Sequence, residues 1–267
     1  MQPLAIAVAQ FAPLVGDLEG SAQRIKELVD RSAQARARML FLPEACLTGY
    51  SRERASECAI DFTTAVGVVE KVARDAGVAV SFGFIERDPQ GGKPFVTHVI
   101  WDDGVRLVYR KTHLGPHEQN AFQLGESLMV GSVAGAYVGV QLCWEGHIPQ
   151  VAATLRAQGA EVIVAPFASG VGGAARLASW AKFLPARASD NGAYVVACNA
   201  LSAALDGTMR GGGMAVYDPK GNVLVDYAGS DEALIVCDLD GVLPRNDVNQ
   251  PMGGLSYFDY QRPELYK

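Results

Sequence analysis

The sequence predicts a mixed α/β fold built in layers. Short apolar runs rich in Val, Ile and Phe alternate with amphipathic helical stretches through the first two thirds of the chain. Turn sequences such as those at 102–104 and 218–221 join further apolar runs as hairpins, which adds antiparallel pairs to the sheets. No low-complexity segment, charge block or linker interrupts the chain, so we expect one domain over residues 1–267.

The predicted strands are apolar runs bounded by Gly, Asp or Pro. Their β-branched and aromatic side chains favour a pleated, half-buried environment. In chain order they cover Leu4–Gln10, Met39–Leu42, Val78–Phe84, Phe95–Trp101, Val105–Tyr109, Tyr137–Leu142, Val162–Ala165, Ala193–Cys198, Gly213–Tyr217, Val223–Tyr227 and Ala233–Cys237.

Helices are predicted where apolar residues recur with helical spacing. In the first helix Ile25, Leu28 and Val29 stand at i, i+3 and i+4, which places them on one face that can pack on a sheet. The four predicted helices cover Leu18–Arg38, Phe62–Asp75, Ile148–Gln158 and Ala174–Asp190.

Composition excludes several classes of protein. The 267 residues are 49% hydrophobic, and the net charge of −6 gives no reason to expect nucleic acid or an anionic membrane as a partner. No apolar run approaches the length of a spanning helix, and the first residues lack a charged segment ahead of a hydrophobic stretch. We therefore expect a soluble, cytoplasmic protein.

The five cysteines are odd in number and contain no CxxC pair, which favours reduced thiols over a disulfide framework or a zinc site. Four of them lie in or beside apolar segments, where we expect core packing: Cys46, Cys58, Cys198 and Cys237. His113 and His117 have the spacing of a helical metal pair, but Gly115 and Pro116 oppose a helix there. We expect neither a metal nor a cofactor.

Three reactive side chains stand directly after predicted strands. Glu44, Lys111 and Cys143 each follow an apolar run at its carboxyl end, which is where open sheets bind ligands. A free thiol is only a few per cent thiolate at pH 7, so a catalytic Cys143 needs a base or a cation nearby. A following helix would favour the thiolate through its positive end. Taken alone, the position also suits an inert, buried cysteine.

The other two side chains could supply what such a cysteine needs. Burial would raise the pKa of Glu44 toward the range of a general base, and Lys111 could stabilise an oxyanion. Glu118 follows seven residues after the lysine and could pair with it or hold a substrate nitrogen. Taken singly, a loop cap, a solvated lysine and a surface charge remain the alternatives for the three.

Together these residues stand in motifs that resemble those of the carbon–nitrogen hydrolase family, also called the nitrilase superfamily. The resemblance covers nearly the whole chain, and its three catalytic motifs occur in the family's order. The matching segments include Leu42–Glu44 with Thr48–Tyr50, Tyr109–Leu114, Gln141–Glu145, Gly159–Ile163, Ala186–Asn191, Asp218–Gly221 and Arg262–Tyr266.

The resemblance implies a four-layer αββα sandwich that pairs into homodimers or larger assemblies. It implies that Cys143 attacks the substrate carbon, that Glu44 takes the thiol proton, and that Lys111 and the backbone N–H of Trp144 hold the oxyanion. Glu118 matches a second glutamate that orients the substrate. The segment 242–267 would be a C-terminal tail involved in subunit contacts.

The expected activity is hydrolysis of a small linear amide to a carboxylic acid and ammonia through a cysteine thioester. Gly146 stands where true nitrilases usually have Asn, and the lysine loop looks like that of the amidase and carbamoylase branches. An N-carbamoyl amine hydrolase and a nitrilase remain alternatives within the family. A non-catalytic binding or scaffold protein is an alternative of another class.

Candidates for the substrate pocket are a few aromatic and small residues near the three motifs. They are Tyr50, Trp144, Phe167, Ser169 and the loop Gly170–Gly173. Two arginines, Arg176 and Arg187, could bind a substrate carboxylate, although we expect Arg187 to be paired within the protein.

Overall fold

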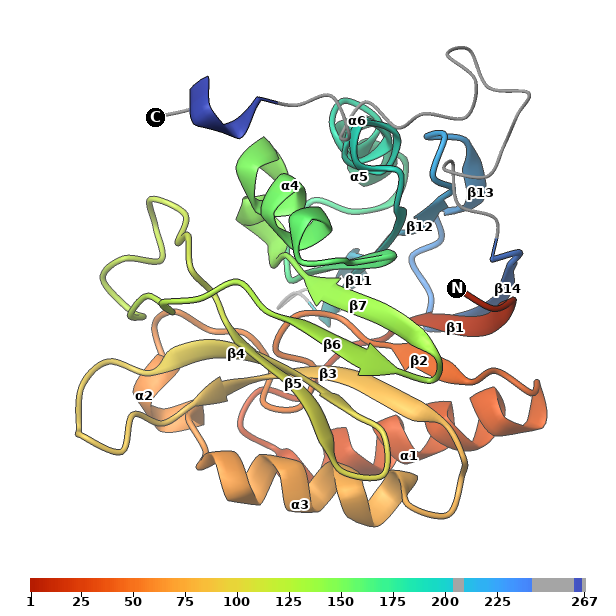
Figure 1. The fold of residues 1–267 in the computed structure, drawn as a ribbon. Coiled ribbons are helices and arrows are strands. Elements are labelled where there is room, and N and C mark those ends of the chain that lie inside the picture. The colour runs from red at the N-terminus through yellow and green to blue at the C-terminus, as the bar shows by residue number, and fades with distance from the viewer. Residues whose placement is uncertain (204–208, 242–261, 266–267) are drawn as a thin grey trace.

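Two six-stranded sheets stack face to face in the computed structural model, which describes residues 1–203, 209–241 and 262–265 (Figure 1). The first sheet has the strand order β14-β1-β2-β3-β4-β5, and the second has the order β13-β12-β9-β8-β7-β6. Both are mixed: β1, β2 and β3 run parallel to one another, as do β7, β8 and β9, and the remaining neighbours are antiparallel.

The strands of the first sheet are β1 Leu4–Gln10, β2 Met39–Phe41, β3 Ala79–Glu86, β4 Phe95–Trp101, β5 Val105–Arg110 and β14 Ala233–Leu239. Those of the second are β6 Val130–Val133, β7 Ala136–Val140, β8 Val162–Phe167, β9 Tyr194–Asn199, β12 Met214–Tyr217 and β13 Val223–Tyr227. A separate pair is formed by β10 Leu201–Ala203 and β11 Met209–Gly211.

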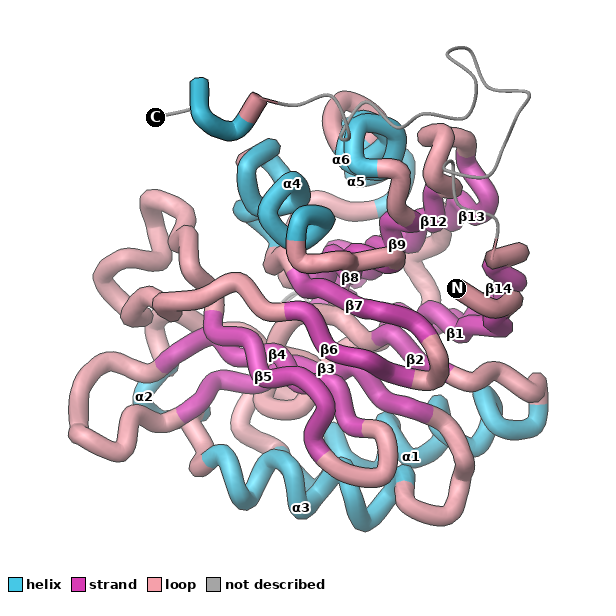
Figure 2. Tube along the Cα trace, in the orientation of Figure 1, coloured by secondary structure: helices cyan, strands magenta, loops and turns pink. Residues whose placement is uncertain are grey.

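Helices cover the outer face of each sheet, so the fold is a four-layer αββα sandwich, as predicted (Figure 2). The first sheet is covered by α1 Leu18–Gln34 and α3 Phe62–Ala73. The second is covered by α4 Pro149–Ala157, α5 Gly173–Trp180 and α6 Leu184–Asn191. Short helical turns are α2 Ala55–Cys58, η1 Cys143–His147 and η4 Pro263–Leu265.

The core follows from the alternation of side chains along each strand. In β1 the side chains of Ile6 and Val8 lie between the two sheets, whereas Ala7 and Ala9 lie on the opposite face, under the helices. The Ile25 side chain of α1 packs in that second layer, as the helical spacing predicted. Each buried apolar side chain of this size contributes about 1.5–3 kcal/mol to folding, so the layers hold the strand ends firmly in place.

The predicted helix Ala174–Asp190 is two helices, and that prediction was wrong. The first ends at Trp180 and the second begins at Leu184, with Pro185 in its first turn. Proline has no backbone N–H and clashes with the carbonyl one turn earlier, so it begins a helix far more readily than it continues one.

Other boundaries also differ from the predictions. The first helix ends at Gln34 rather than Arg38, because Arg36 adopts a left-handed backbone with φ of 60° and stops the helix. The short elements α2, β6, β10 and β11 were missed, since three or four residues give too little periodicity to recognise. The proposed tail at 242–267 lies outside the described residues except for 262–265, and its part in subunit contacts stays a prediction.

No helix in the part of the chain that the structure describes is long and apolar enough to cross a membrane.

Candidate active site

Loops at the ends of strands from both sheets carry the predicted side chains. Glu44 follows β2, Lys111 follows β5 directly, and Cys143 follows β7. The ammonium Nζ of Lys111 donates to Glu44 Oε1 at 2.8 Å and to Glu118 Oε1 at 2.7 Å. Lys111 is thus held between the two carboxyl groups, and its side chain is completely buried.

Lys111 keeps its positive charge in this setting. Burial acts to lower its pKa, but the nearby Glu44, Cys143 and Glu118 outweigh burial and raise the pKa of Lys111 above its ordinary value. The site therefore holds a fixed cation, as stabilisation of an oxyanion requires.

The pKa values of the two glutamates are shifted in opposite directions, although both carboxyl groups contact the same lysine. Burial raises the pKa of Glu44 to about 7, against the opposing effect of Lys111. The pKa of Glu118 is lowered: burial opposes the change, but the charge of Lys111 and hydrogen bonds from Tyr50 and Gly115 outweigh it. Those bonds measure 2.5 Å from the Tyr50 hydroxyl and 2.6 Å from the Gly115 N–H. Glu118 is therefore the charged partner of Lys111, while Glu44 can exchange a proton near neutral pH.

Glu44 is also held from the second sheet. Its Oε2 accepts the backbone N–H of Ala168 at 3.1 Å, and Ala168 follows β8. The contact fixes one carboxyl oxygen of Glu44 and ties it to the loop that begins at Ala168.

Cys143 occupies an uncommon backbone conformation. It is the first residue of η1 and has φ of +43°, a left-handed value that is strained for a residue with a side chain. Burial and the neighbouring Glu44 raise the pKa of its thiol to about 12, although Lys111 acts in the opposite direction. The thiol is therefore protonated near neutral pH and needs a base.

Glu145 links the lysine loop to the cysteine turn, a role that the motif alone did not reveal. Its side chain is completely buried, and it accepts five hydrogen bonds. Oε1 receives the Tyr109 hydroxyl, the Thr112 hydroxyl and N–H, and the His113 N–H, while Oε2 receives the Leu142 N–H at 2.6 Å. The residues adjacent to Lys111 and to Cys143 are thus fixed by one carboxyl group.

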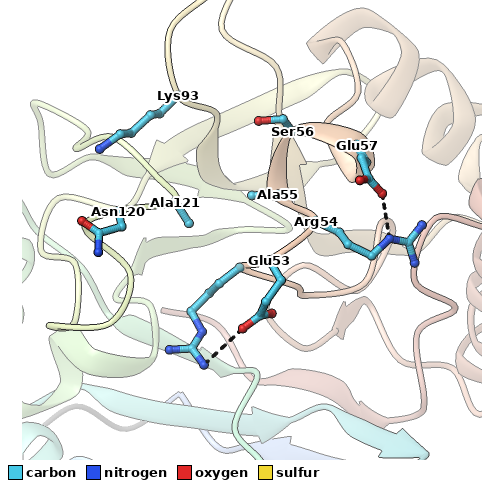
Figure 3. Close-up of a pocket in the computed structure, with 9 residues that line it drawn as sticks. Glu53, Arg54, Ala55, Ser56, Glu57, Lys93, Asn120 and Ala121 are labelled. Carbon is cyan, nitrogen blue, oxygen red and sulfur yellow. Dashed lines mark hydrogen bonds and ion pairs between the residues drawn. The ribbon is translucent and has the colours of Figure 1, made fainter.

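A cleft of about 320 Å³ opens beside this cluster. Among its lining residues are Tyr50, Glu118 and Ala168, which contact the Lys111–Glu44 cluster, and the charged Arg52 and Glu53. A second, smaller surface cleft of about 220 Å³ shares the last two residues. Figure 3 shows this second cleft between the 53–57 segment and the side chains of Lys93 and Asn120. Of the two site glutamates, only Glu118 lines the first cleft, together with the charged side chains of Arg52 and Glu53.

The other predicted pocket residues are arranged differently. Trp144 is 43% exposed and lies against His147, whereas Phe167 is only 2% exposed and packs on Trp180. The Ser169 hydroxyl accepts a hydrogen bond from Arg176. Sequence reasoning gave no role to Asn199, which holds the 169–171 loop because its amide donates to the backbone oxygens of Ser169 and Val171 and accepts the Ser169 N–H.

Arg187 is paired within the protein, as predicted, since its Nε donates to the Gly146 carbonyl. Cys46, Cys58 and Cys198 are buried as predicted, but Cys237 is only partly buried at the edge of the core. No group of three or more His, Cys, Asp or Glu side chains in the described ranges is arranged to hold a metal ion.

The structure is thus a four-layer sandwich that carries a cysteine, a lysine and two carboxyl groups on the loops that follow its strands. Residues 5–243 match the sequence model described as Carbon-nitrogen hydrolase, and the chain belongs to that family.

Proteins with similar sequences include amidases and nitrilases. An (R)-stereoselective amidase of Pseudomonas sp is 31% identical over 76% of this chain and 73% of its own length. The deaminated glutathione amidase of Homo sapiens is 30% identical over 98% of this chain and 83% of its own length. A nitrilase of Pyrococcus abyssi is 29% identical over 98% of both chains.

Solved structures of an amidase from Nesterenkonia sp. have the same fold. One superposes with a TM-score of 0.81 at 25% identity, over 98% of this chain and 94% of that one. A mutant of the amidase from Nesterenkonia sp. AN1, also at 0.81 and 25% and covering 98% of both chains, carries acrylamide added at the active-site cysteine.

Proposed function

We propose that this protein hydrolyses small linear carboxamides to carboxylic acid and ammonia through a thioester on Cys143. The observation that carries the proposal is the ammonium of Lys111 held at 2.8 Å from a carboxyl group, Glu44, whose pKa lies near 7. A fixed cation beside a neutral-range base is what a poorly acidic thiol needs for attack on an amide. The amidases among the relatives support the same chemistry.

In the first half-reaction, Glu44 takes the proton of the Cys143 thiol as the sulfur attacks the amide carbon. The carbonyl oxygen becomes an oxyanion, which Lys111 and the backbone N–H of Trp144 stabilise. The carbon–nitrogen bond then breaks, Glu44 gives its proton to the departing nitrogen, and ammonia leaves. The acyl group remains on the sulfur as a thioester.

In the second half-reaction, Glu44 takes a proton from water as the water oxygen attacks the thioester carbon. The second oxyanion meets the same donors, so one set of fixed groups serves both steps. The carbon–sulfur bond breaks, the proton returns to sulfur, and the carboxylic acid leaves. Glu118 keeps Lys111 in place through both steps and presents its carboxylate to the substrate nitrogen.

Nitriles and N-carbamoyl amines can undergo the same initial attack, so the products distinguish the three activities. A nitrilase would release ammonia from a nitrile, and a carbamoyl-amine hydrolase would also release carbon dioxide. We favour amides because Gly146 departs from the nitrilase pattern.

The experiment is a product assay on an aliphatic amide, the nitrile of equal carbon number and an N-carbamoyl amine. We expect ammonia release to be fastest from the amide, with no release in the Cys143→Ala variant. Faster turnover of the nitrile or of the carbamoyl amine would move the protein to that branch. If no compound in the panel acylates Cys143, the non-catalytic scaffold becomes the better account.

A further inference from the structure

Arg176 is a buried cation without an acidic partner. It lies on α5 and is only 7% exposed, and no carboxylate of the described residues lies within ion-pair distance of its guanidinium. Burial lowers the pKa of Arg176, because the charged form loses its hydration. Burying a charge is costly unless an opposite charge compensates it. The positive charge of Arg176 lacks such a partner among the described residues.

Neutral groups alone hold the guanidinium in place. Its Nε donates to the Val171 carbonyl at 3.2 Å and its Nη2 donates to the Ser169 hydroxyl. The rings of Phe167 and Trp180 lie 5.5 and 5.8 Å from the guanidinium carbon. The side chain is therefore fixed in orientation, while its charge is not matched.

The two hydrogen bonds leave three of the five guanidinium N–H groups unused. Nη1 keeps both of its N–H groups, since it makes no hydrogen bond within the described residues. Nη1 is also absent from the buried unpartnered atoms of that part of the chain, so it is not sealed from solvent. The free Nη1–Nη2 edge is the planar fork that binds a carboxylate in two parallel hydrogen bonds.

The guanidinium belongs to the same region as the proposed nucleophile. Ser169 directly follows Ala168, whose N–H donates to Glu44 Oε2 at 3.1 Å. Arg176 is also close enough to Cys143 for its charge to act on the thiol, where it opposes the increase in pKa caused by burial and Glu44.

We propose that Arg176 binds a carboxylate at the far end of the substrate, so that the preferred substrates are ω-amides of short dicarboxylic acids. This proposal rests on the proposed amide hydrolysis. A carboxylate would supply the counter-charge that Arg176 lacks, whereas a neutral amide would leave the cation unpaired.

Arg52 is the competing cation. It lines the cleft beside the site, but it is exposed and lies 3.8 Å from the Glu53 carboxylate. Exposed charges of this kind contribute little to binding because water and salt screen them. Exposed Arg54, which pairs with Glu57 and does not line the site cleft, is a matched control.

The test compares succinamate with butyramide, which have the same length and differ in a carboxylate or methyl at the far end. Wild-type protein should favour succinamate in kcat/KM. Arg176→Met should reduce that preference about 10- to 100-fold, mainly through KM, as expected for a charged hydrogen-bonded pair. Arg176→Lys should retain part of the preference, and Arg54→Met should retain all of it.

Three results would overturn the inference. A wild-type preference for butyramide would do so without any variant, which matters if Arg176→Met fails to fold. An equal loss on both substrates in Arg176→Met would mean that Arg176 only holds the 169–171 loop. A preference lost in Arg52→Met but kept in Arg176→Met would assign the carboxylate to Arg52.

Binding to the Cys143→Ala variant separates this inference from the proposed function. Calorimetry should show tighter binding of succinamate than of butyramide, because recognition by Arg176 requires no turnover. If succinamate is favoured in binding but wild-type protein releases no ammonia, the proposed function fails and the anion site stands. If wild-type protein hydrolyses both amides at equal kcat/KM, the proposed function stands and the anion site fails.

Discussion

Glu145 accepts a 2.8 Å hydrogen bond from the backbone N–H of Thr112, which joins the cysteine turn to the lysine loop. The same carboxyl group accepts the Leu142 N–H, one residue before the nucleophile. The relative position of Lys111 and Cys143 therefore depends on a side chain that touches neither. Glu145 is a positioning residue.

Glu145→Gln should lower kcat about 10- to 100-fold with little change in KM, because the carboxamide nitrogen cannot accept the Leu142 N–H. It should also reduce the free energy of unfolding by about 1–3 kcal/mol, as expected when a buried donor loses its acceptor. Steady-state kinetics and urea denaturation provide the two readouts. Thr112→Val, which removes only the hydroxyl donor, is the milder control, and wild-type kcat in Glu145→Gln would contradict the positioning role.

The proton balance of the site predicts a specific pH dependence. Because the pKa of Glu44 is raised to about 7, the base is protonated below that pH, so kcat/KM should rise about tenfold per pH unit and level off above 7. Alkylation of Cys143 by iodoacetamide should follow the same curve, since the thiol gives its proton to Glu44.

Glu44→Gln should abolish the step near pH 7 in that alkylation. Peptide mapping must follow Cys143 alone, because the protein has five cysteines. If the pH midpoint of Cys143 alkylation lies near the pKa of an ordinary thiol and does not change in Glu44→Gln, Glu44 is not the base.

A buried histidine predicts how stability responds to acid. His98 is completely buried and shares a 2.7 Å hydrogen bond with Ser81, and burial lowers the pKa of His98 to about 3. The unfolded chain binds this proton near pH 6.5, so folding stability falls as pH decreases from about 6.5 toward 3. For one proton bound by the unfolded chain and not by the folded protein, the free energy of unfolding falls by about 1.4 kcal/mol for each unit that the pH decreases.

Between pH 6 and pH 5, wild-type protein should therefore lose about 1 kcal/mol more stability than His98→Gln. Urea denaturation at the two pH values gives this difference even if the variant is less stable at both. The exposed His117, changed to Gln, is the control. Equal losses in wild type and His98→Gln would mean that His98 titrates in the folded protein.

The motifs in the sequence were sufficient to predict the sandwich. They also placed Glu44 and Lys111 after apolar strands and Glu118 in the lysine loop, and the structure joins these three side chains by hydrogen bonds. The break before Leu184 was missed because apolar periodicity continues through that region, although Pro185 is a sequence signal that could have revealed it. The raised pKa of the Cys143 thiol could not be predicted from the sequence, because the burial that raises it depends on residues distant along the chain.

Intact mass of the protein, quenched during turnover of a small amide, would detect the proposed thioester on Cys143. The proposal predicts wild-type protein carrying the acyl group on Cys143, with ammonia released in proportion. It predicts neither adduct nor ammonia for Cys143→Ala with an unchanged circular dichroism spectrum. Wild-type rates of ammonia release in Cys143→Ala would contradict the claim.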